Sequence, residues 1–263
     1  MDSIIEEWLG TYESRDTKTS YKYDIAKFQR WLNRANIVFR QLKLADVRSW
    51  QSTLGSTPGD RRLASSVKSL LKYAHNNEYL PNVDRCLQIP KRSAVLVERK
   101  LSRQQVDRML VLAKGNDKLL LKLLFYLGLR ISEARRLKRS DIKSINGELV
   151  FGVTRKGNKF QNVSLSRGLS QVIVHELPTR GYLFKGKKNG CLSRSQSYRR
   201  VKKIAKQVVP KASCHWFRHA FCTLSLQANA SLIDVSKAMN HSSIAVTSQY
   251  VHESGRSVSR FLE

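Results

Sequence analysis

The sequence predicts a mainly helical protein with one small β element, an α+β combination divided into two domains. Three observations support this prediction. Apolar residues recur at helical spacing through most of the chain, two short strand-like runs flank a turn near its middle, and a proline-led basic stretch interrupts the pattern before residue 100. With 263 residues, the chain is long enough for two modest domains that each bury a core.

The first 90 residues have the pattern of helices joined by short loops. Residues 17–32 carry apolar side chains at steps of four and three, the spacing of an amphipathic helix that Thr19 or Ser20 is expected to cap. The members of this stripe are Tyr21, Ile25, Phe28 and Leu32.

Three further stripes follow helical spacing, at residues 4–12, 47–54 and 63–74. The segment STPGD at 56–60, between the last two stripes, has the composition of a turn. Together these elements predict a separate N-terminal helical bundle over residues 1–93.

A break in the pattern follows this bundle. Residues 90–100 begin with a proline, contain several basic side chains and lack sustained periodicity, as an exposed linker would. Ser102 and Gln105 then have the spacing of a capping box that opens the next helix. We therefore expect a linker over 94–100 and a second domain over 101–263.

The second domain is expected to be mostly helical with one β-hairpin. Residues 117–129 form an almost wholly apolar run that suits a buried central helix. Strand patterns at 148–154 and 160–165 flank RKGNK, whose Gly-Asn pair predicts the hairpin turn. Helical patterns resume at 196–208 and 214–228.

Positive charge is concentrated in the second domain. The chain has 48 Lys and Arg against 20 Asp and Glu, a net charge of +28. Residues 1–90 carry 14 basic and 10 acidic side chains, whereas residues 91–263 carry 34 and 10. This excess predicts a polyanionic partner, bound in a salt-dependent manner as nucleic acid is. A merely solvated surface is the weaker interpretation, and a membrane surface is weaker still because the charge is dispersed.

The location of the protein is also constrained by its sequence. No run approaches the roughly 18–20 apolar residues of a membrane-spanning helix. The acidic, amphipathic opening lacks the basic start and apolar core of a secretory signal. The four cysteines have no zinc-ribbon or disulfide-framework spacing. We therefore expect a cytoplasmic protein with reduced thiols and no membrane partner.

Four segments carry the residue types that phosphoryl transfer needs: GLRISE at 128–133, KGNK at 156–159, HWFRH at 215–219, and NHSSIAVTSQY at 240–250. In this order they resemble the tyrosine recombinase signature, which runs G-L-R-x-S-E, K-G-x-K in a β-hairpin, H-x-x-R-H, then G-H-S-S and a tyrosine nine residues after its histidine. Residues 17–32 resemble the opening of the core-binding domain of that family. The resemblance thus covers nearly the whole chain.

Cleavage of a DNA strand at phosphorus requires a nucleophile, cations at the non-bridging oxygens and a proton for the leaving 5′ oxygen. Arg130 and Arg218 suit the second requirement, because a guanidinium can hold two phosphate oxygens at once. The resemblance places both at the scissile phosphate. Taken singly, an arginine in so basic a domain is most often a surface charge.

The resemblance assigns the nucleophile to Tyr250, whose attack would leave a 3′-phosphotyrosine and a free 5′-hydroxyl. Such a covalent intermediate conserves the energy needed for rejoining, so no ATP is required. Lys156 is implied as the general acid, with its neighbour Lys159 as the competing candidate.

Histidines and one glutamate complete the implied site. His215 and His241 resemble the two phosphate-proximal histidines of the family, and His241 is expected to act mainly as a hydrogen-bond donor. His219 is expected to have a supporting role. Glu133 lies three residues after Arg130, on the same helical face, and is expected to orient a catalytic side chain.

A metal cluster is an alternative interpretation of Cys214, His215, His219 and Cys222, because histidines at i and i+4 on a helix can share a zinc ion. Arg218 would place a permanent positive charge beside such an ion. We therefore expect neither a metal nor any other cofactor.

Three departures from the family pattern mark the chain as divergent. Asn240 stands where relatives usually have glycine, although asparagine tolerates left-handed backbone. Gln161 and Ser164 replace the basic residue and the proline of R-x-V-P-L, and Val83 stands where many relatives have proline. None of these changes removes a catalytic group.

The resemblance implies a site-specific recombinase whose two domains close around double-stranded DNA as a C-shaped clamp. Two protomers are expected on inverted half-sites, and four in a synapse that passes through a Holliday junction, with the last residues, 255–263, docked on a neighbouring protomer. A prokaryotic plasmid or phage context is expected. Integration, excision and resolution stay open, as does the need for accessory proteins. The alternatives are a non-cleaving architectural or regulatory DNA-binding protein and a type IB topoisomerase.

Overall fold

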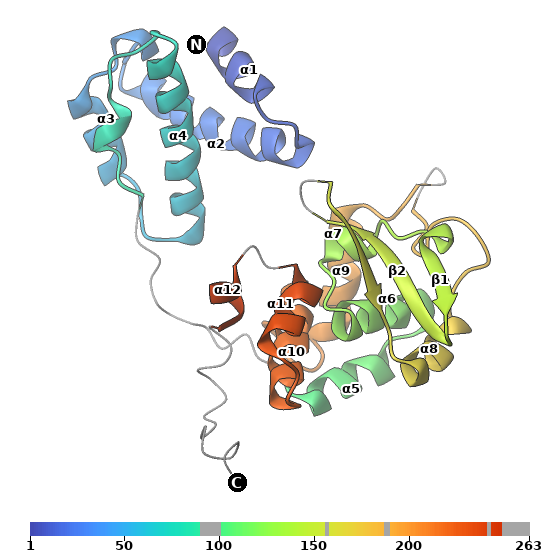
Figure 1. The fold of residues 1–263 in the computed structure, drawn as a ribbon. Coiled ribbons are helices and arrows are strands. Elements are labelled where there is room, and N and C mark those ends of the chain that lie inside the picture. The colour runs from blue at the N-terminus through green and yellow to red at the C-terminus, as the bar shows by residue number, and fades with distance from the viewer. Residues whose placement is uncertain (90–100, 156–157, 187–189, 241–242, 249–263) are drawn as a thin grey trace. The chain divides into compact units, whose positions relative to one another are not determined.

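A computed structural model describes residues 1–89, 101–155, 158–186, 190–240 and 243–248. The chain separates into two compact units, Met1–Val95 and Leu96–Glu263, called unit 1 and unit 2 below (Figure 1). The expected linker at 94–100 lies outside the described residues. No helix in the described part of the chain is long and apolar enough to cross a membrane.

All of the regular secondary structure described in unit 1 is helical, and short loops join the helices. Apolar side chains of its helices form one buried cluster that includes Trp8, Phe28, Trp50 and Leu70. The elements are α1 (Asp2–Gly10), α2 (Arg15–Arg34), the 3-10 helix η1 (Phe39–Gln41), α3 (Leu44–Ser52), α4 (Pro58–Asn76) and the 3-10 helix η2 (Asp84–Cys86).

The start of α2 differs from the sequence prediction. Ser14 is the N-cap, and its hydroxyl accepts a hydrogen bond from the backbone of Thr17. Thr19 lies inside the helix, where its hydroxyl donates to the carbonyl of Arg15 at 3.0 Å. The prediction was wrong because several hydroxyl residues precede the apolar stripe, and any of them has the chemistry of a cap.

The segment 56–60 is also more than a turn. Thr57 and Asp60 form a capping box that opens α4, with Pro58 as the first helical residue. Turn and N-cap residues share one composition, so the sequence alone did not separate the two. The capping box predicted at Ser102 and Gln105 is confirmed, with hydrogen bonds of 2.9 and 3.2 Å.

A buried carboxylate joins α2 to α4 in unit 1. Arg62 donates from Nε and Nη2 to the two oxygens of Asp24, at 2.9 and 2.7 Å. The hydroxyl of Ser66 donates to the same carboxylate at 2.9 Å. This forked pairing satisfies a side chain that is wholly buried.

Unit 2 is mainly helical with one small antiparallel sheet, which confirms the predicted fold class. Its helices are α5 (Arg103–Leu112), α6 (Gly115–Tyr126), α7 (Ile131–Ala134), the 3-10 helix η3 (Arg139–Asp141), α8 (Arg167–Val174), α9 (Arg194–Ala205), α10 (Cys214–Gln227), α11 (Leu232–Met239) and α12 (Ile244–Ser248). Figure 1 shows the sheet on one flank of this unit and α10 and α11 on another.

The sheet has three strands in the order β1-β2-β3, all antiparallel: β1 (Ile142–Ile145), β2 (Glu148–Thr154) and β3 (Phe160–Ser164). β2 and β3 are the two strands of the predicted hairpin, and β1 adds a third. Asn146 and Gly147 join β1 to β2 with φ angles of 50° and 80°, a two-residue turn that asparagine and glycine favour.

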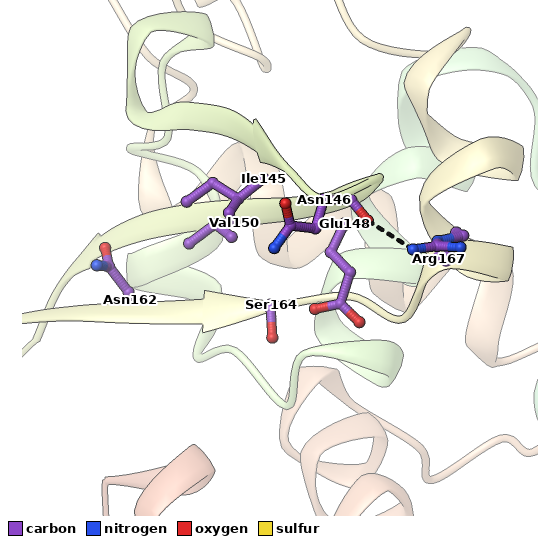
Figure 2. A pocket seen from close by; sticks show the side chains of 7 residues that line it. All are labelled: Ile145, Asn146, Glu148, Val150, Asn162, Ser164 and Arg167. Atoms are coloured by element: carbon purple, nitrogen blue, oxygen red, sulfur yellow. Dashed lines mark hydrogen bonds between the residues drawn. The ribbon is translucent and has the colours of Figure 1, made fainter.

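A hollow of about 410 Å³ lies on the sheet beside this turn (Figure 2). Arg167, at the start of α8, donates from Nη2 to the carbonyl of Asn146 at 3.1 Å. The lining residues are Ile145, Asn146, Glu148, Val150, Asn162, Ser164 and Arg167, and no residue of the predicted site is among them.

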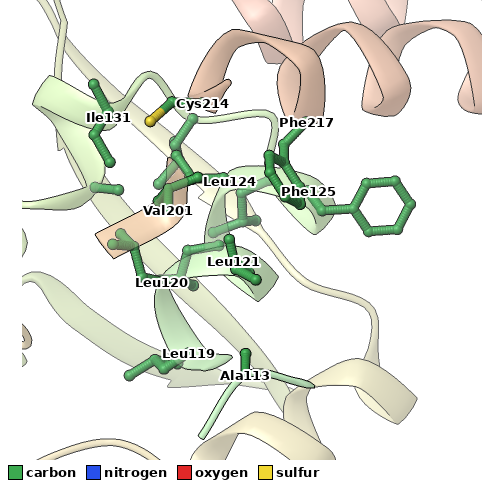
Figure 3. Packing of buried hydrophobic residues seen from close by; sticks show 14 of the residues in the cluster. Ala113, Leu119, Leu120, Leu121, Leu124, Phe125, Ile131, Val201, Cys214 and Phe217 are labelled. Atoms are coloured by element: carbon green, nitrogen blue, oxygen red, sulfur yellow. The ribbon is translucent and has the colours of Figure 1, made fainter. Parts of the chain in front are cut away.

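The core of unit 2 is built around α6. The residues from Leu119 to Phe125 are buried, as the apolar run predicted, and they pack with side chains of α9 and α10 such as Val201 and Phe217 (Figure 3). Lys122 is buried within this stretch and pairs with Glu176 at 2.5 Å. The buried charge is therefore matched by an anion from the segment that follows α8.

Candidate active site

A left-handed glycine separates α6 from α7. Gly128 has φ +58°, and a Cβ added there would lie 2.5 Å from the ring of Phe221. Only glycine meets both conditions without strain. The chain turns here, so α6 ends at Tyr126, within the apolar run predicted at 117–129, and Arg130 is the N-cap of α7.

The carboxylate of Glu133 lies beside two arginines of the predicted site, Arg130 and Arg218. Its Oε1 accepts from the guanidinium of Arg130 at 2.9 Å, and its Oε2 accepts from the Arg130 backbone at 2.8 Å. Nη1 of Arg218 lies 4.0 Å from the same Oε2. Residues from two separate sequence motifs thus meet at one buried carboxylate.

Arg218 is fixed between two segments of unit 2. Its Nη1 donates to the carbonyl of Gly128 at 2.5 Å, and its Nη2 donates to the carbonyl of Met239. Its side chain is 7% exposed, whereas that of Arg130 is 33% exposed. Arg130 therefore presents the more accessible guanidinium of the two.

A third arginine, which the sequence analysis did not single out, reaches the same carboxylate. Arg155 follows β2, and its Nη1 donates to Oε2 of Glu133 at 2.7 Å. Burial lowers the pKa of Arg155, the nearby carboxylate of Glu133 raises it, and the charge of Arg130 lowers it. The sequence gives no signal for this position beyond a basic residue beside the KGNK motif.

His215 and His219 lie in the first two turns of α10. His215 is exposed and His219 is half-buried. Their spacing of four residues, with Arg218 three after His215, places all three toward one side of the helix. Histidine and arginine donors thus belong to one helix that packs against α6.

The two cysteines of this region are poor thiolates. Cys214 and Cys222 are buried, and burial raises the pKa of each to about 12. Within the described ranges, no group of three or more His, Cys, Asp or Glu side chains is arranged to hold a metal ion. The alternative interpretation as a metal cluster therefore gains no support from the geometry.

Lys156, His241 and Tyr250 lie outside the described residues, as does the segment 255–263. The residues beside them are described. The backbone N–H of Arg155 donates to the carbonyl of Lys159 at 2.7 Å. Asn240 ends α11 with φ 47° and ψ 55°, which confirms that asparagine takes the left-handed conformation here.

The chain is similar to known proteins over most of its length. The profile of the phage integrase family matches residues 99–256. The tyrosine recombinase XerD of Shewanella oneidensis is 27% identical, covering 96% of this chain and 91% of that protein. XerD of Vibrio cholerae is 26% identical, covering 95% and 91%.

Solved structures share the fold. XerH site-specific recombinase bound to a palindromic difH substrate has a TM-score of 0.70 at 20% identity, covering 94% of this chain and 78% of that one. A lambda integrase tetramer bound to a Holliday junction has a TM-score of 0.76 at 15% identity, covering 97% and 77%. Because the family profile spans more than half of the chain, the chain belongs to the phage integrase family and is a tyrosine site-specific recombinase.

Proposed function

We propose that this recombinase cuts and rejoins DNA by attack of Tyr250 on the scissile phosphate. The observation that carries the proposal is the meeting of Arg130 and Arg218 at Glu133, since two fixed guanidiniums from separate motifs suit a phosphate with developing charge. The XerD relatives and the DNA-bound structures support the same reaction.

The reaction proceeds by exchange of one phosphorus–oxygen bond for another. The oxygen of Tyr250 attacks phosphorus while the bond to the 5′ oxygen breaks, giving a 3′-phosphotyrosine and a 5′-hydroxyl. Arg130 and Arg218 stabilise the non-bridging oxygens, and Lys156 gives its proton to the leaving oxygen. Attack by a 5′-hydroxyl then reverses the step, so ATP is not consumed.

The remaining site residues hold or move protons around the phosphate. His215 and His241 donate hydrogen bonds to the non-bridging oxygens or accept the tyrosine proton. Glu133 orients the arginines, and His219 supports α10. Charge is neutralised by side chains, so the step needs no metal and survives EDTA.

Residues 1–93 act as a core-binding domain and residues 101–263 as the catalytic domain, and the two close around DNA as a C-shaped clamp. Dimers on inverted half-sites and a tetrameric synapse with a Holliday junction follow by analogy with the solved XerH and lambda integrase complexes. Residues 255–263 dock on a neighbouring protomer. The bacterial XerD relatives and the phage integrase profile favour a prokaryotic plasmid or phage context.

The test begins with DNA that the purified protein selects from a pool of random duplexes. A nicked suicide substrate built on that DNA should form a covalent adduct, visible on a denaturing gel, with the wild type and not with Tyr250→Phe. An adduct that persists in Tyr250→Phe would mean that another residue attacks. Binding without adduct would indicate the non-cleaving alternative, and relaxation of plasmids that lack the selected site would indicate a topoisomerase.

A further inference from the structure

We infer that Arg155 is a positioning residue for strand cleavage. It fastens the residue after β2, which directly precedes Lys156, to Glu133, and so keeps the proton donor in register with Arg130. This inference rests on the proposed function, and in particular on Lys156 as the general acid.

The side chain of Arg155 joins three segments that are distant in sequence. Nη1 donates to Glu133 at 2.7 Å, Nη2 donates to the carbonyl of Ala238 near the end of α11 at 2.8 Å, and Nε donates to Oε1 of Gln161 on β3 at 3.2 Å. The side chain is 0% exposed. Each nitrogen of the planar fork therefore has its own partner, which fixes the orientation of the whole group.

The backbone of Arg155 is also hydrogen-bonded. Its N–H donates to the carbonyl of Lys159 at 2.7 Å, so two residues that flank Lys156 in sequence are joined. The backbone and side chain of Arg155 thus connect Lys159 to the carboxylate that also holds Arg130. A shift of Arg155 therefore moves the residue that directly precedes Lys156 relative to Arg130.

Packing alone does not explain a cation at this position. Burying a guanidinium is costly, and an apolar side chain of similar volume often serves a purely structural role as well or better. Burial also lowers the pKa of Arg155, which shows the penalty on its charged form. The charge is explained if the role of Arg155 is to hold the chain that leads to Lys156 against Glu133.

Gln161 complements Arg155. Its amide oxygen accepts from Arg155, and its amide nitrogen donates to the carbonyl of Lys237 at 2.9 Å. The family pattern has a basic residue at position 161, which here would place a second cation against the guanidinium of Arg155. The neutral amide at 161 therefore matches the cation at 155.

The experiment compares two suicide substrates that differ at one atom. One has the normal 5′ oxygen at the scissile phosphate, and the other has a bridging sulfur, which leaves as a thiolate and needs no proton donor because thiols are far more acidic than alcohols. Arg155→Gln should slow adduct formation about 10- to 100-fold with oxygen, up to the lower end of what a general acid contributes. With the bridging-sulfur substrate, Arg155→Gln should form the adduct at a rate close to that of the wild type.

Two further variants test whether the rate defect is specific to the guanidinium of Arg155. Arg135→Gln is the matched control, because Arg135 is a half-buried arginine of unit 2 whose guanidinium donates to Cys191 and Leu192, outside the cluster around Glu133. Arg135→Gln should leave the ratio of the adduct-formation rates with the oxygen and sulfur substrates at its wild-type value. Arg155→Lys keeps the buried charge without the fork, and its smaller defect should also recover with sulfur. This variant gives the result if Arg155→Gln does not fold.

The possible outcomes distinguish a failure of the positioning role from a failure of the proposed function. A defect of the Arg155 variants that sulfur does not repair, or no defect at all, overturns the positioning role. An unrepaired defect in Lys156→Ala removes the general acid, and the positioning role falls with it. Absence of adduct in the wild type overturns the proposed function itself.

Discussion

Arg218 donates a hydrogen bond of 2.5 Å to the carbonyl of Gly128, so the guanidinium of α10 depends on the turn between α6 and α7. Gly128→Ala should disturb this bond for two reasons. The added Cβ would lie 2.5 Å from the ring of Phe221, and residue 128 has a positive φ that alanine rarely adopts. We expect a loss of about 1–3 kcal/mol in the free energy of unfolding, the usual cost of backbone strain, and a larger loss in cleavage. Urea unfolding and the adduct assay measure the two effects.

Gly168→Ala is the control for that substitution. Gly168 lies in α8 with open space where an added Cβ would lie, and alanine favours helices, so the free energy of unfolding should stay equal or rise slightly. Equal behaviour of the two alanine variants would contradict the role assigned to the turn.

Arg130→Ala should separate chemistry from binding. It removes the more exposed of the two arginines in the predicted phosphate site, so adduct formation should fall strongly. DNA affinity should fall by about 1–3 kcal/mol if one charge-assisted hydrogen bond is lost. Gel-shift titration at fixed salt gives the affinity, with Tyr250→Phe as the variant that keeps it. Unchanged cleavage by Arg130→Ala would remove this arginine from the site.

The buried pair of Lys122 and Glu176 makes a prediction about stability. Glu176→Gln leaves the buried ammonium of Lys122 without its anion, and we expect unfolding to become easier by about 1–3 kcal/mol. Adding Lys122→Met should restore most of the loss, because an apolar side chain then fills the site.

Urea unfolding of the two single variants and the double variant measures this coupling. The exposed pair of Arg103 and Asp107 is the comparison, and Asp107→Asn should cost less than about 0.5 kcal/mol. Additive effects of Lys122→Met and Glu176→Gln would mean that the pair is not coupled.

Cys222 makes unit 2 sensitive to alkaline pH. Burial raises the pKa of Cys222 from near 9 to about 12, so its thiol ionises first in the unfolded chain. The stability that this thiol contributes is complete below about pH 9 and is lost as the pH rises toward 12. The difference in unfolding free energy between the wild type and Cys222→Ala should therefore shrink over this interval. A constant difference would contradict the shift.

Several parts of the fold could be predicted because their signal is local. The apolar run of α6, the capping box of α5 and the two strands of the hairpin each depend on neighbours in sequence. The strand β1 was missed because only Ile142 of its four residues is buried, which leaves no alternation to detect. The Asn146-Gly147 pair was the available signal, since this dipeptide is typical of two-residue hairpin turns.

The same difference between local and long-range signals applies to the residues of the candidate site. Arg130 and Arg218 could be predicted as site residues because each stands in a contiguous motif, whereas their meeting at Glu133 depends on the tertiary structure. Arg155 was missed because two of its three side-chain partners, Glu133 and Ala238, lie 22 and 83 residues away, and no sequence pattern predicts that an arginine will be buried there. Contacts of this range become visible only when the chain is folded.

The cluster around Glu133 has a thermodynamic consequence. Three positive side chains, Arg130, Arg155 and Arg218, surround one negative carboxylate, so the group by itself carries an excess of two positive charges. A phosphate that enters would offset this excess only in the folded state, because unfolding disperses the three arginines. Under the proposed function, binding and folding are then linked, and we expect a DNA backbone to act as a counterion that raises the melting temperature of unit 2.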